Sequence, residues 1–232
     1  MKILKSLMII FFMLIAVFAI ATYLVMKQPK FGKSPSGERM ERIMKSPHYK
    51  NGKFENINET PQFAEDTSMP EAMFRMLFGK KENLRPTQKF NFIKTDLKTL
   101  NPVENAYIWM GHSSYFIQID GKKILVDPVF SGNASPFTFT TKAFNQTDLY
   151  TTDDIPELDY LIISHDHWDH LDYQTVKKLM LKVKKVITGL GTGAHLEYWG
   201  YDPKKLIELD WNESSDLGNG FKVYCEPARH FS

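Results

Sequence analysis

The pattern of apolar and polar positions sets apart the first segment of the chain. Residues 7–26 contain no charged residue, glycine or proline, and a helix of about this length crosses a hydrocarbon core of roughly 30 Å. We therefore expect residues 1–27 to form an N-terminal transmembrane anchor. A cleaved signal peptide is the alternative, because lysines precede the run and Ala19 and Ala21 offer small residues for cleavage. We favour the anchor because the apolar run continues past that point.

Lysines stand on both sides of this run, so the positive-inside rule does not choose an orientation. The prediction is a single-pass membrane protein whose side of the membrane is left open. If the segment is cleaved, the mature chain would instead be secreted or periplasmic.

Residues 28–100 carry prolines at intervals and many polar side chains, a pattern that resists long regular elements. We interpret this segment as a linker and wrapping arm. A short helix is predicted at 69–78, where apolar residues recur at helical spacing and Gly79 supplies a stop. We expect this helix to pack on the domain, with contact to a membrane surface as the alternative.

From residue 101 onward, short apolar runs alternate with turn signals. Strands are predicted at 106–110, 114–119, 123–126, 160–163, 185–188, 206–209 and 221–225. One helix should begin after Asp172 as N-cap and carry apolar residues on one face as far as Val183, and another is expected near 194–199. Alternating strands and helices predict an α/β layered domain.

Composition narrows the chemistry. With 29 basic and 27 acidic side chains the formal net charge is +2, which gives no concentrated basic face for nucleic acid. The single cysteine, Cys225, excludes an internal disulfide framework and a four-cysteine zinc site. A metal site in this chain must therefore use histidine and carboxylate.

Such residues are concentrated directly after the apolar run 160–163. Three histidines and two aspartates occupy six consecutive positions: His165, Asp166, His167, Asp169 and His170, with Trp168 between them. His165 and His167 can face one ion from an extended backbone, while Asp169 and His170 can reach a second ion. Imidazole nitrogen and carboxylate oxygen suit zinc, with manganese or iron as alternatives.

The string from His165 to His170 resembles the HxHxDH signature of the metallo-β-lactamase fold superfamily. Further motifs resemble, in the same order, the branch that contains N-acylphosphatidylethanolamine-hydrolysing phospholipase D. They are WMGHSS at 109–114, LVDPVF at 125–130, LDY at 171–173, IELDW at 207–211 and EPARHFS at 226–232. The resemblance covers residue 106 to the end of the chain.

This resemblance implies an αββα sandwich with a dinuclear zinc site at one edge. His165, His167 and His230 would bind the first metal, and Asp169 and His170 would contribute to the second. From the residues alone, His230 is equally well a ligand or a histidine at the surface or core edge.

Three residues near these motifs each have two interpretations. Asp127 could accept a hydrogen bond from the free ring nitrogen of a ligand histidine, or could simply form a turn with Pro128. His112 lies near the site in the resembling family, although its place after Gly111 favours a structural hydrogen bond. Arg229 could pair with a substrate phosphate, the plainer interpretation being a solvated arginine.

The ligand set predicts a metal-dependent hydrolase that uses a metal-bound hydroxide oriented by Asp169. By resemblance, the function is that of a membrane-anchored, phospholipase D-like phosphodiesterase. Its substrate would be a membrane lipid or a small phosphodiester, and the membrane itself would be contacted through the N-terminal helix. Another ester or a lactone is the alternative substrate class.

The resembling enzymes continue beyond the histidine that corresponds to His230. There they supply a metal-bridging aspartate, a final ligand histidine and the second half of the sandwich. We therefore expect 101–232 to be the N-terminal portion of the domain in a C-terminally truncated chain, so that the sandwich is incomplete. One zinc ion rather than two could then be held, and a catalytically impaired domain with a partial metal site is the alternative function.

Overall fold

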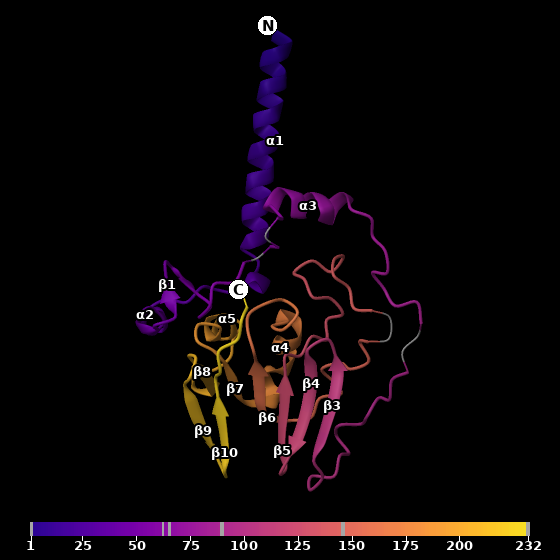
Figure 1. Ribbon diagram of the computed structural model, residues 1–232, viewed down its shortest axis with the longest axis vertical. Helices are drawn as coiled ribbons and strands as arrows, with labels where there is room; N and C mark the ends of the chain where they lie inside the picture. The colour runs from indigo at the N-terminus through magenta and orange to yellow at the C-terminus, as the bar shows by residue number, and fades with distance from the viewer. Residues whose placement is uncertain (1, 62, 65, 89–90, 145–146, 231–232) are drawn as a thin grey trace.

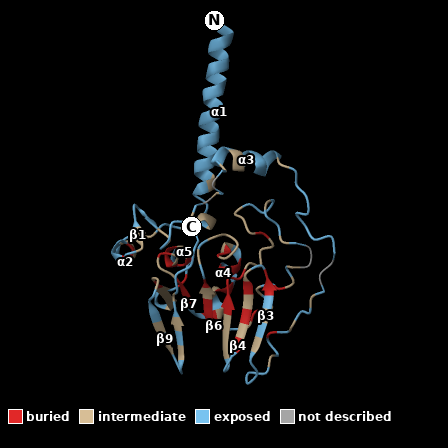
Figure 2. Ribbon diagram, viewed as in Figure 1, coloured by how far each residue is buried: buried red, intermediate tan, exposed pale blue. Residues whose placement is uncertain are grey.

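The computed structural model describes residues 2–61, 63–64, 66–88, 91–144 and 147–230. Helix α1 (Lys2–Met26) projects away from the remainder of the molecule, and none of its residues is buried (Figures 1 and 2). It is long and apolar enough to cross a membrane, by length and composition. The predicted apolar N-terminal helix is therefore present.

The arm contains more structure than the sequence predicts. Its elements are η1 (Pro29–Phe31), α2 (Glu38–Lys45), β1 (Tyr49–Lys50), β2 (Lys53–Phe54) and α3 (Met69–Phe78). Helix α3 has the predicted bounds, with Ser68 as N-cap and Gly79 at its end. The expectation that α3 packs on the domain is wrong, because no residue of the helix is buried.

Eight strands follow the arm. A six-stranded sheet is formed by β3 (Ala106–Gly111), β4 (Ser114–Ile119), β5 (Lys122–Val126), β6 (Leu158–Ile163), β7 (Val183–Gly189) and β8 (Leu206–Leu209), in that spatial order. A separate hairpin pairs β9 (Ser214–Gly218) with β10 (Phe221–Tyr224). The sequence predicted all of these strands except β9, whose polar residues give no apolar run.

The sheet is mixed. Strands β3, β4 and β5 pair antiparallel, whereas β5, β6, β7 and β8 run parallel. Because parallel strands end at the same edge of a sheet, the segments that follow β5 and β6 emerge close together. This topology brings Asp127, which follows β5, next to Ser164, which follows β6.

Two short helices cover one face of the sheet. They are α4 (Tyr173–Leu179) and α5 (Gly193–Tyr198), with single turns η2 (Met180–Lys182) and η3 (Pro203–Lys205) leading into strands. Val176 and Leu179 of α4 and Leu196 of α5 join the main core cluster. A smaller cluster on Tyr160, Ile187 and Leu209 lies against Leu217 and Val223 of the β9–β10 hairpin.

The predicted helix after Asp172 is shorter than expected. Asp172 caps α4 by accepting a hydrogen bond from the Gln174 backbone N–H at 3.1 Å, as predicted. Val183, however, is not the last apolar residue of the helical face but the first residue of β7, where it pairs with Leu158. Strand pairing and burial therefore override the helical periodicity at this position.

These layers confirm the predicted α/β class, with a central mixed sheet and two helices on one face. In Figure 2 the buried residues gather in the sheet and beneath α4 and α5, while α1 and α3 are exposed along most of their length. The core thus positions the edge of the sheet from which the histidine-rich loop emerges.

Candidate metal centre

The histidine-rich loop is fixed at both of its ends. Before it, β6 is buried at most positions, and Ile163 is 1% exposed. Within the loop, the backbone N–H groups of His170 and Leu171 both donate to the carbonyl oxygen of His167, at 2.9 and 2.7 Å. After it, Asp172 begins α4. A short turn between two packed elements therefore presents the side chains of residues 165–170.

Three imidazole rings meet at the first candidate group, which consists of His165, His167 and His230. His230 Nε2 lies 2.9 Å from His165 Nε2 and 3.1 Å from His167 Nδ1. Nitrogens bound at 2.0–2.1 Å in a tetrahedral zinc site are about 3.4 Å apart. The convergence of three nitrogens at nearly this spacing fits a metal tripod.

His230 comes from the segment that follows β10, and the arm contacts it there. Its backbone N–H donates to Asn56 Oδ1 at 3.1 Å. The edge of the β9–β10 hairpin and the arm therefore bring His230 to the loop that carries His165 and His167.

The second candidate group consists of His112, Asp169 and His170. Asp169 Oδ2 lies 2.9 Å from His112 Nε2 and 3.7 Å from His170 Nε2. His112 stands in the tight connection between β3 and β4 with a positive φ of 45°. Gly111 before it has no room for a side chain, because a Cβ would meet the Thr147 carbonyl oxygen. The glycine thus permits the turn that directs His112 toward Asp169.

Asp127, which follows the end of β5, fixes the orientation of the histidine-rich loop. This aspartate is 4% exposed. Its carboxylate accepts hydrogen bonds from the Ser164 backbone N–H at 2.7 Å and the Ser164 hydroxyl at 2.6 Å, and lies 2.8 Å from His170 Nδ1. With Nδ1 donating to Asp127, the Nε2 atom of His170 is left to face Asp169. This is the role that the sequence offered for Asp127.

Local electrostatics favour, for His165 and Asp169, the protonation states that metal ligands need. Burial, together with the neighbouring His170, His230 and His167, lowers the pKa of His165 to about 4, so its imidazole is neutral at pH 7. Burial raises the pKa of Asp169, but the hydrogen bonds from His112 and from its own backbone outweigh that effect and leave the pKa below the ordinary value. Asp169 is therefore ionised.

The donor set passes a test of fit for a divalent metal. Each group offers imidazole nitrogen, and the second adds a carboxylate oxygen, which is the chemistry of zinc sites that lack cysteine. The ligand atoms within each group lie within 4.8 Å of one another. Both groups contain residues of the same loop, so two ions would lie side by side.

Residues 122–232 match the family described as the beta-lactamase superfamily domain. This part of the chain is therefore similar to a beta-lactamase superfamily domain. The matched segment begins at β5 and contains the histidine-rich loop, Asp127 and His230. His112 lies before it.

The chain is similar to proteins of several organisms. A protein of Mycobacterium tuberculosis is 33% identical over 188 residues, covering 81% of this chain and 50% of that protein. The N-acyl-phosphatidylethanolamine-hydrolyzing phospholipase D 1 of Caenorhabditis elegans is 31% identical over 136 residues, covering 53% of this chain and 36% of that protein. A metal-dependent hydrolase of Caldivirga maquilingensis is 28% identical over 126 residues, covering 53% of this chain and 48% of that protein.

The chain spans 50% of the length of the Mycobacterium tuberculosis protein. A solved structure, that of a diiron beta-hydroxylase from Streptomyces venezuelae, is similar over 51% of this chain and 23% of that one, with 26% identity and a TM-score of 0.39. The family match covers residues 122–232, and a metal-dependent hydrolase is among the proteins to which the chain is similar.

Within this superfamily domain, the structure brings together most of the residues singled out from the sequence. His165, His167 and His230 form one group, and Asp169 and His170 belong to the other. Arg229 is exposed, and among the described residues no hydrogen bond or ion pair holds its guanidinium. The motif residues Phe231 and Ser232 lie outside the described residues.

Sequence reasoning missed His112 as a member of the second group. It expected a structural hydrogen bond, and the structure gives His112 a hydrogen bond whose partner is Asp169. The available signal was the Gly111–His112 pair at a predicted strand connection. It could not decide the matter, since Asp169 is 57 residues away.

The segment after α1 lies directly against the histidine-rich loop. Phe31 packs edge to face on Trp168, with ring centroids 5.6 Å apart. These two rings, Asp166 and His195 help to line a cavity of about 200 Å³. Burial lowers the pKa of His195, and the nearby Asp166 partly opposes this effect. The loop is therefore contacted by the part of the arm closest to α1.

Proposed function

We propose that this chain is the metal-binding part of a membrane-anchored, zinc-dependent phosphodiesterase of the phospholipase D type. The observation that carries the proposal is the meeting of two groups of side chains at the histidine-rich loop, where His230 joins His165 and His167, and His112 joins Asp169 and His170. Similarity to the Caenorhabditis elegans phospholipase D supports the substrate class. The activity is proposed for the whole protein, of which this chain can be a part.

Zinc is the proposed metal because the donors are imidazole nitrogens and a carboxylate oxygen. Such ions, when bound, lower the pKa of a coordinated water and polarise the oxygen atoms of the electrophile. His165, His167 and His230 would hold one ion. His112, Asp169 and His170 would hold the other.

The chain's own residues would prepare the site for hydrolysis. Asp127 holds the His170 ring in one orientation. The ionised Asp169 carboxylate can accept a hydrogen bond from a water molecule and so orient it toward the substrate. Arg229, one residue before His230 and exposed, is proposed to pair with the substrate phosphate.

Anchoring by α1 is part of the same proposal. All residues of this helix lack burial, and the lipid tails of a bilayer would cover them. A lipid phosphodiester substrate would then lie in the same bilayer. No nucleic-acid partner is proposed, because the net charge is only +2.

The test uses the full chain, purified in detergent, stripped of metal and reloaded with zinc. Bound zinc is counted by mass spectrometry, and hydrolysis is followed with a phosphodiester, a lactone and an amide reporter. We expect two ions per chain and turnover of the phosphodiester. His165→Ala should lose an ion and the activity. The matched control His48→Ala should change neither, since His48 stacks on Trp211 outside both groups.

Two other outcomes have distinct meanings. Turnover of the lactone alone would replace the phosphodiesterase with a hydrolase of another ester class, the candidate that the Caldivirga maquilingensis metal-dependent hydrolase leaves open. One ion or none, without turnover of any reporter, would contradict the proposal and favour a catalytically impaired domain with a partial metal site.

A further inference from the structure

Helix α3 presents its apolar side chains outward. Met73, Phe74, Met76, Leu77 and Phe78 are 51–71% exposed. The side of the helix that is partly covered carries Glu71 and Ala72. This is the reverse of a helix that packs on a soluble domain, where the apolar side chains face the core.

The helix is nevertheless well formed by its own residues. Ser68 Oγ accepts a hydrogen bond from the Glu71 backbone N–H at 3.4 Å, and Pro70 occupies the first turn. Arg75 pairs with Glu71 one turn away, at 2.7 Å. Capping and this ion pair hold a helix whose apolar side has no partner among the described residues.

Helix α3 lies at the same end of the molecule as α1 and the metal centre. In Figure 1, α3 runs crosswise to α1, at the end of the molecule from which α1 leaves. The carboxyl end of β6, which delivers the histidine-rich loop, points toward the same end. Since α1 is expected along the membrane normal, α3 would lie in the membrane plane.

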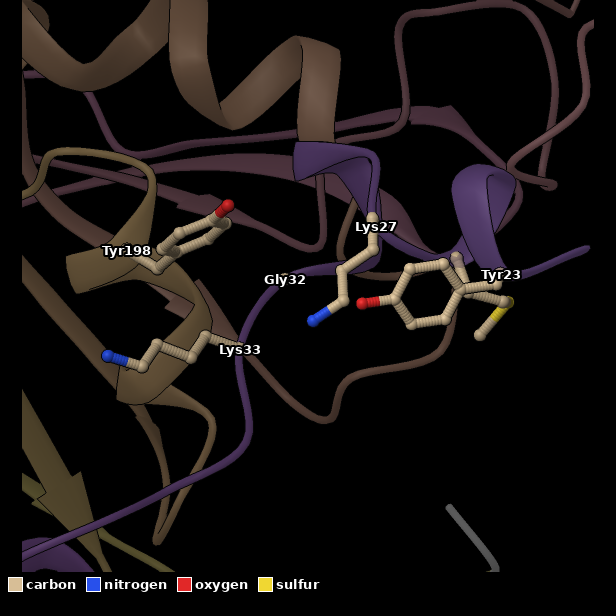
Figure 3. A pocket seen from close by; sticks show the side chains of 6 residues that line it. Tyr23, Lys27, Gly32, Lys33 and Tyr198 are labelled. Carbon is tan, nitrogen blue, oxygen red and sulfur yellow. The ribbon is translucent and has the colours of Figure 1, made fainter. Parts of the chain in front are cut away.

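Basic side chains accompany both helices at this level. Lys27 and Lys33 line a cavity of about 420 Å³ between the end of α1 and α5, together with Tyr23 and Tyr198 (Figure 3). The segment after α3 carries Lys80, Lys81 and Arg85, all exposed, of which Lys80 is paired with Glu82. Cations and tyrosines at the level where a spanning helix leaves the bilayer complement anionic lipid head groups.

We propose that α3 is a second membrane contact, an interfacial helix that lies on an anionic phospholipid bilayer beside α1. Its Met and Phe side chains enter the head-group boundary, and the nearby lysines and arginine contact the lipid phosphates. This proposal rests on the proposed anchoring by α1. Two contacts, one along the normal and one in the plane, fix the rotation of the domain, so that the histidine-bearing edge faces the bilayer.

The test places a spin label at single cysteines in the full chain, with Cys225→Ser to remove the native thiol. The labelled positions are Ile15 in α1, Phe74 in α3 and Leu181 in η2. Leu181 precedes β7, so it lies near the amino ends of the parallel strands, whereas the histidine-rich loop follows the carboxyl end of β6. The chain is reconstituted in phosphatidylcholine vesicles with or without phosphatidylglycerol. Collisions with oxygen, which enters lipid, and with a water-soluble nickel chelate are measured.

The label at 74 should collide several-fold more with oxygen and several-fold less with nickel than the label at 181. This difference should grow with phosphatidylglycerol. If nickel reaches 74 while 15 is in lipid, the anchor stands and the α3 proposal is overturned. If 74 is shielded from both reagents, protein covers α3, either a second copy or another part of the chain, and the proposal is again overturned. A label at 15 exposed to nickel overturns the anchor independently.

A charge variant provides the matched control. Leu77→Glu should bring the label at 74 into contact with nickel, because a carboxylate resists entry into the head-group boundary. Val103→Glu also places a charge at an exposed apolar residue, 86% exposed, but lies away from α3. It should leave the label at 74 unchanged. Equal effects of the two variants would contradict a contact specific to α3.

Discussion

At the scale of single residues, the metal centre depends on one buried carboxylate. Asp127 accepts hydrogen bonds from two groups of Ser164 and holds Nδ1 of His170. It does so with a positive φ of 43°, a conformation that aspartate tolerates better than most residues. Local backbone strain of this kind persists where the surroundings determine the conformation, and such positions gather at functional sites.

Asp127→Asn should weaken zinc binding about 10–100-fold, because the amide nitrogen cannot accept the hydrogen bond from His170 Nδ1. Zinc affinity is measured by competition with a chelator of known strength. Asp120→Asn is the control, since Asp120 also has a positive φ but is exposed in a hairpin turn. Equal affinities in the wild type and the Asp127 variant would show that the ring of His170 needs no such partner.

At the scale of elements, α2 fastens the arm to the domain. Arg39 Nε donates to Glu208 at 2.7 Å, and its Nη2 donates to Glu197 at 2.9 Å. Glu208 also accepts from the backbone N–H groups of Gly191 and Gly193. The same helix buries Ile43, which is 2% exposed. The partly buried Glu208 carboxylate, which accepts several hydrogen bonds, thus binds the arm.

Arg39→Ala should therefore lower the free energy of unfolding of the arm and its docking surface by about 1.5–3 kcal/mol, the usual range for a hydrogen bond to a charged group. Arg42→Ala removes an ion pair with Glu213 that is 45% exposed on both sides, so about 0–1 kcal/mol is expected. Chemical unfolding and limited proteolysis of the arm measure both. Identical behaviour of the two variants would refute a special role for Arg39.

The elements that sequence predicted are those with their own signals. Helix α3 carries a cap, a proline and a terminal glycine, and β6 is a continuous apolar run, so both could be located. Helix α2 could not be found, since it depends on Glu197 and Glu208, about 160 residues away. The expectation that α3 packs on the domain was wrong for the same kind of reason, because periodicity shows which residues share a face and not what that face contacts.

At the scale of the whole molecule, a charged side chain connects neighbouring strands of the sheet, in addition to the hydrogen bonds between their backbones. Asp159 at the start of β6 accepts from the Lys123 backbone N–H on β5, at 3.0 Å, and from Lys184 on β7, at 3.1 Å. Burial raises the pKa of Asp159, but these donors outweigh it and leave the pKa below the ordinary value. The folded state thus favours the ionised form.

A carboxyl group whose pKa is lower in the folded than in the unfolded state stabilises the fold at pH values above its unfolded-state pKa, near 3.9. This stabilisation is lost as the pH falls through the pKa of the folded state. Asp159→Asn should therefore lower the melting temperature at pH 7, and the difference from wild type should narrow below about pH 4. Melting is followed by circular dichroism across this range. Asp153→Asn, at an exposed position, serves as control. A difference that does not change with pH would exclude the ionisation of Asp159 as its cause.

The connection between α1 and the domain has a consequence for reach. Backbone hydrogen bonds continue from α1 through Lys27, Gln28 and Phe31 to Gly32, where a side chain would collide with His195. From Met26 to Phe31, which contacts Trp168, the chain can extend at most about 17 Å. The tether is therefore short and stiff. With α1 in a bilayer, as proposed, this connection would hold the histidine-rich loop close to the lipid surface, so that only molecules at that surface would be within its range.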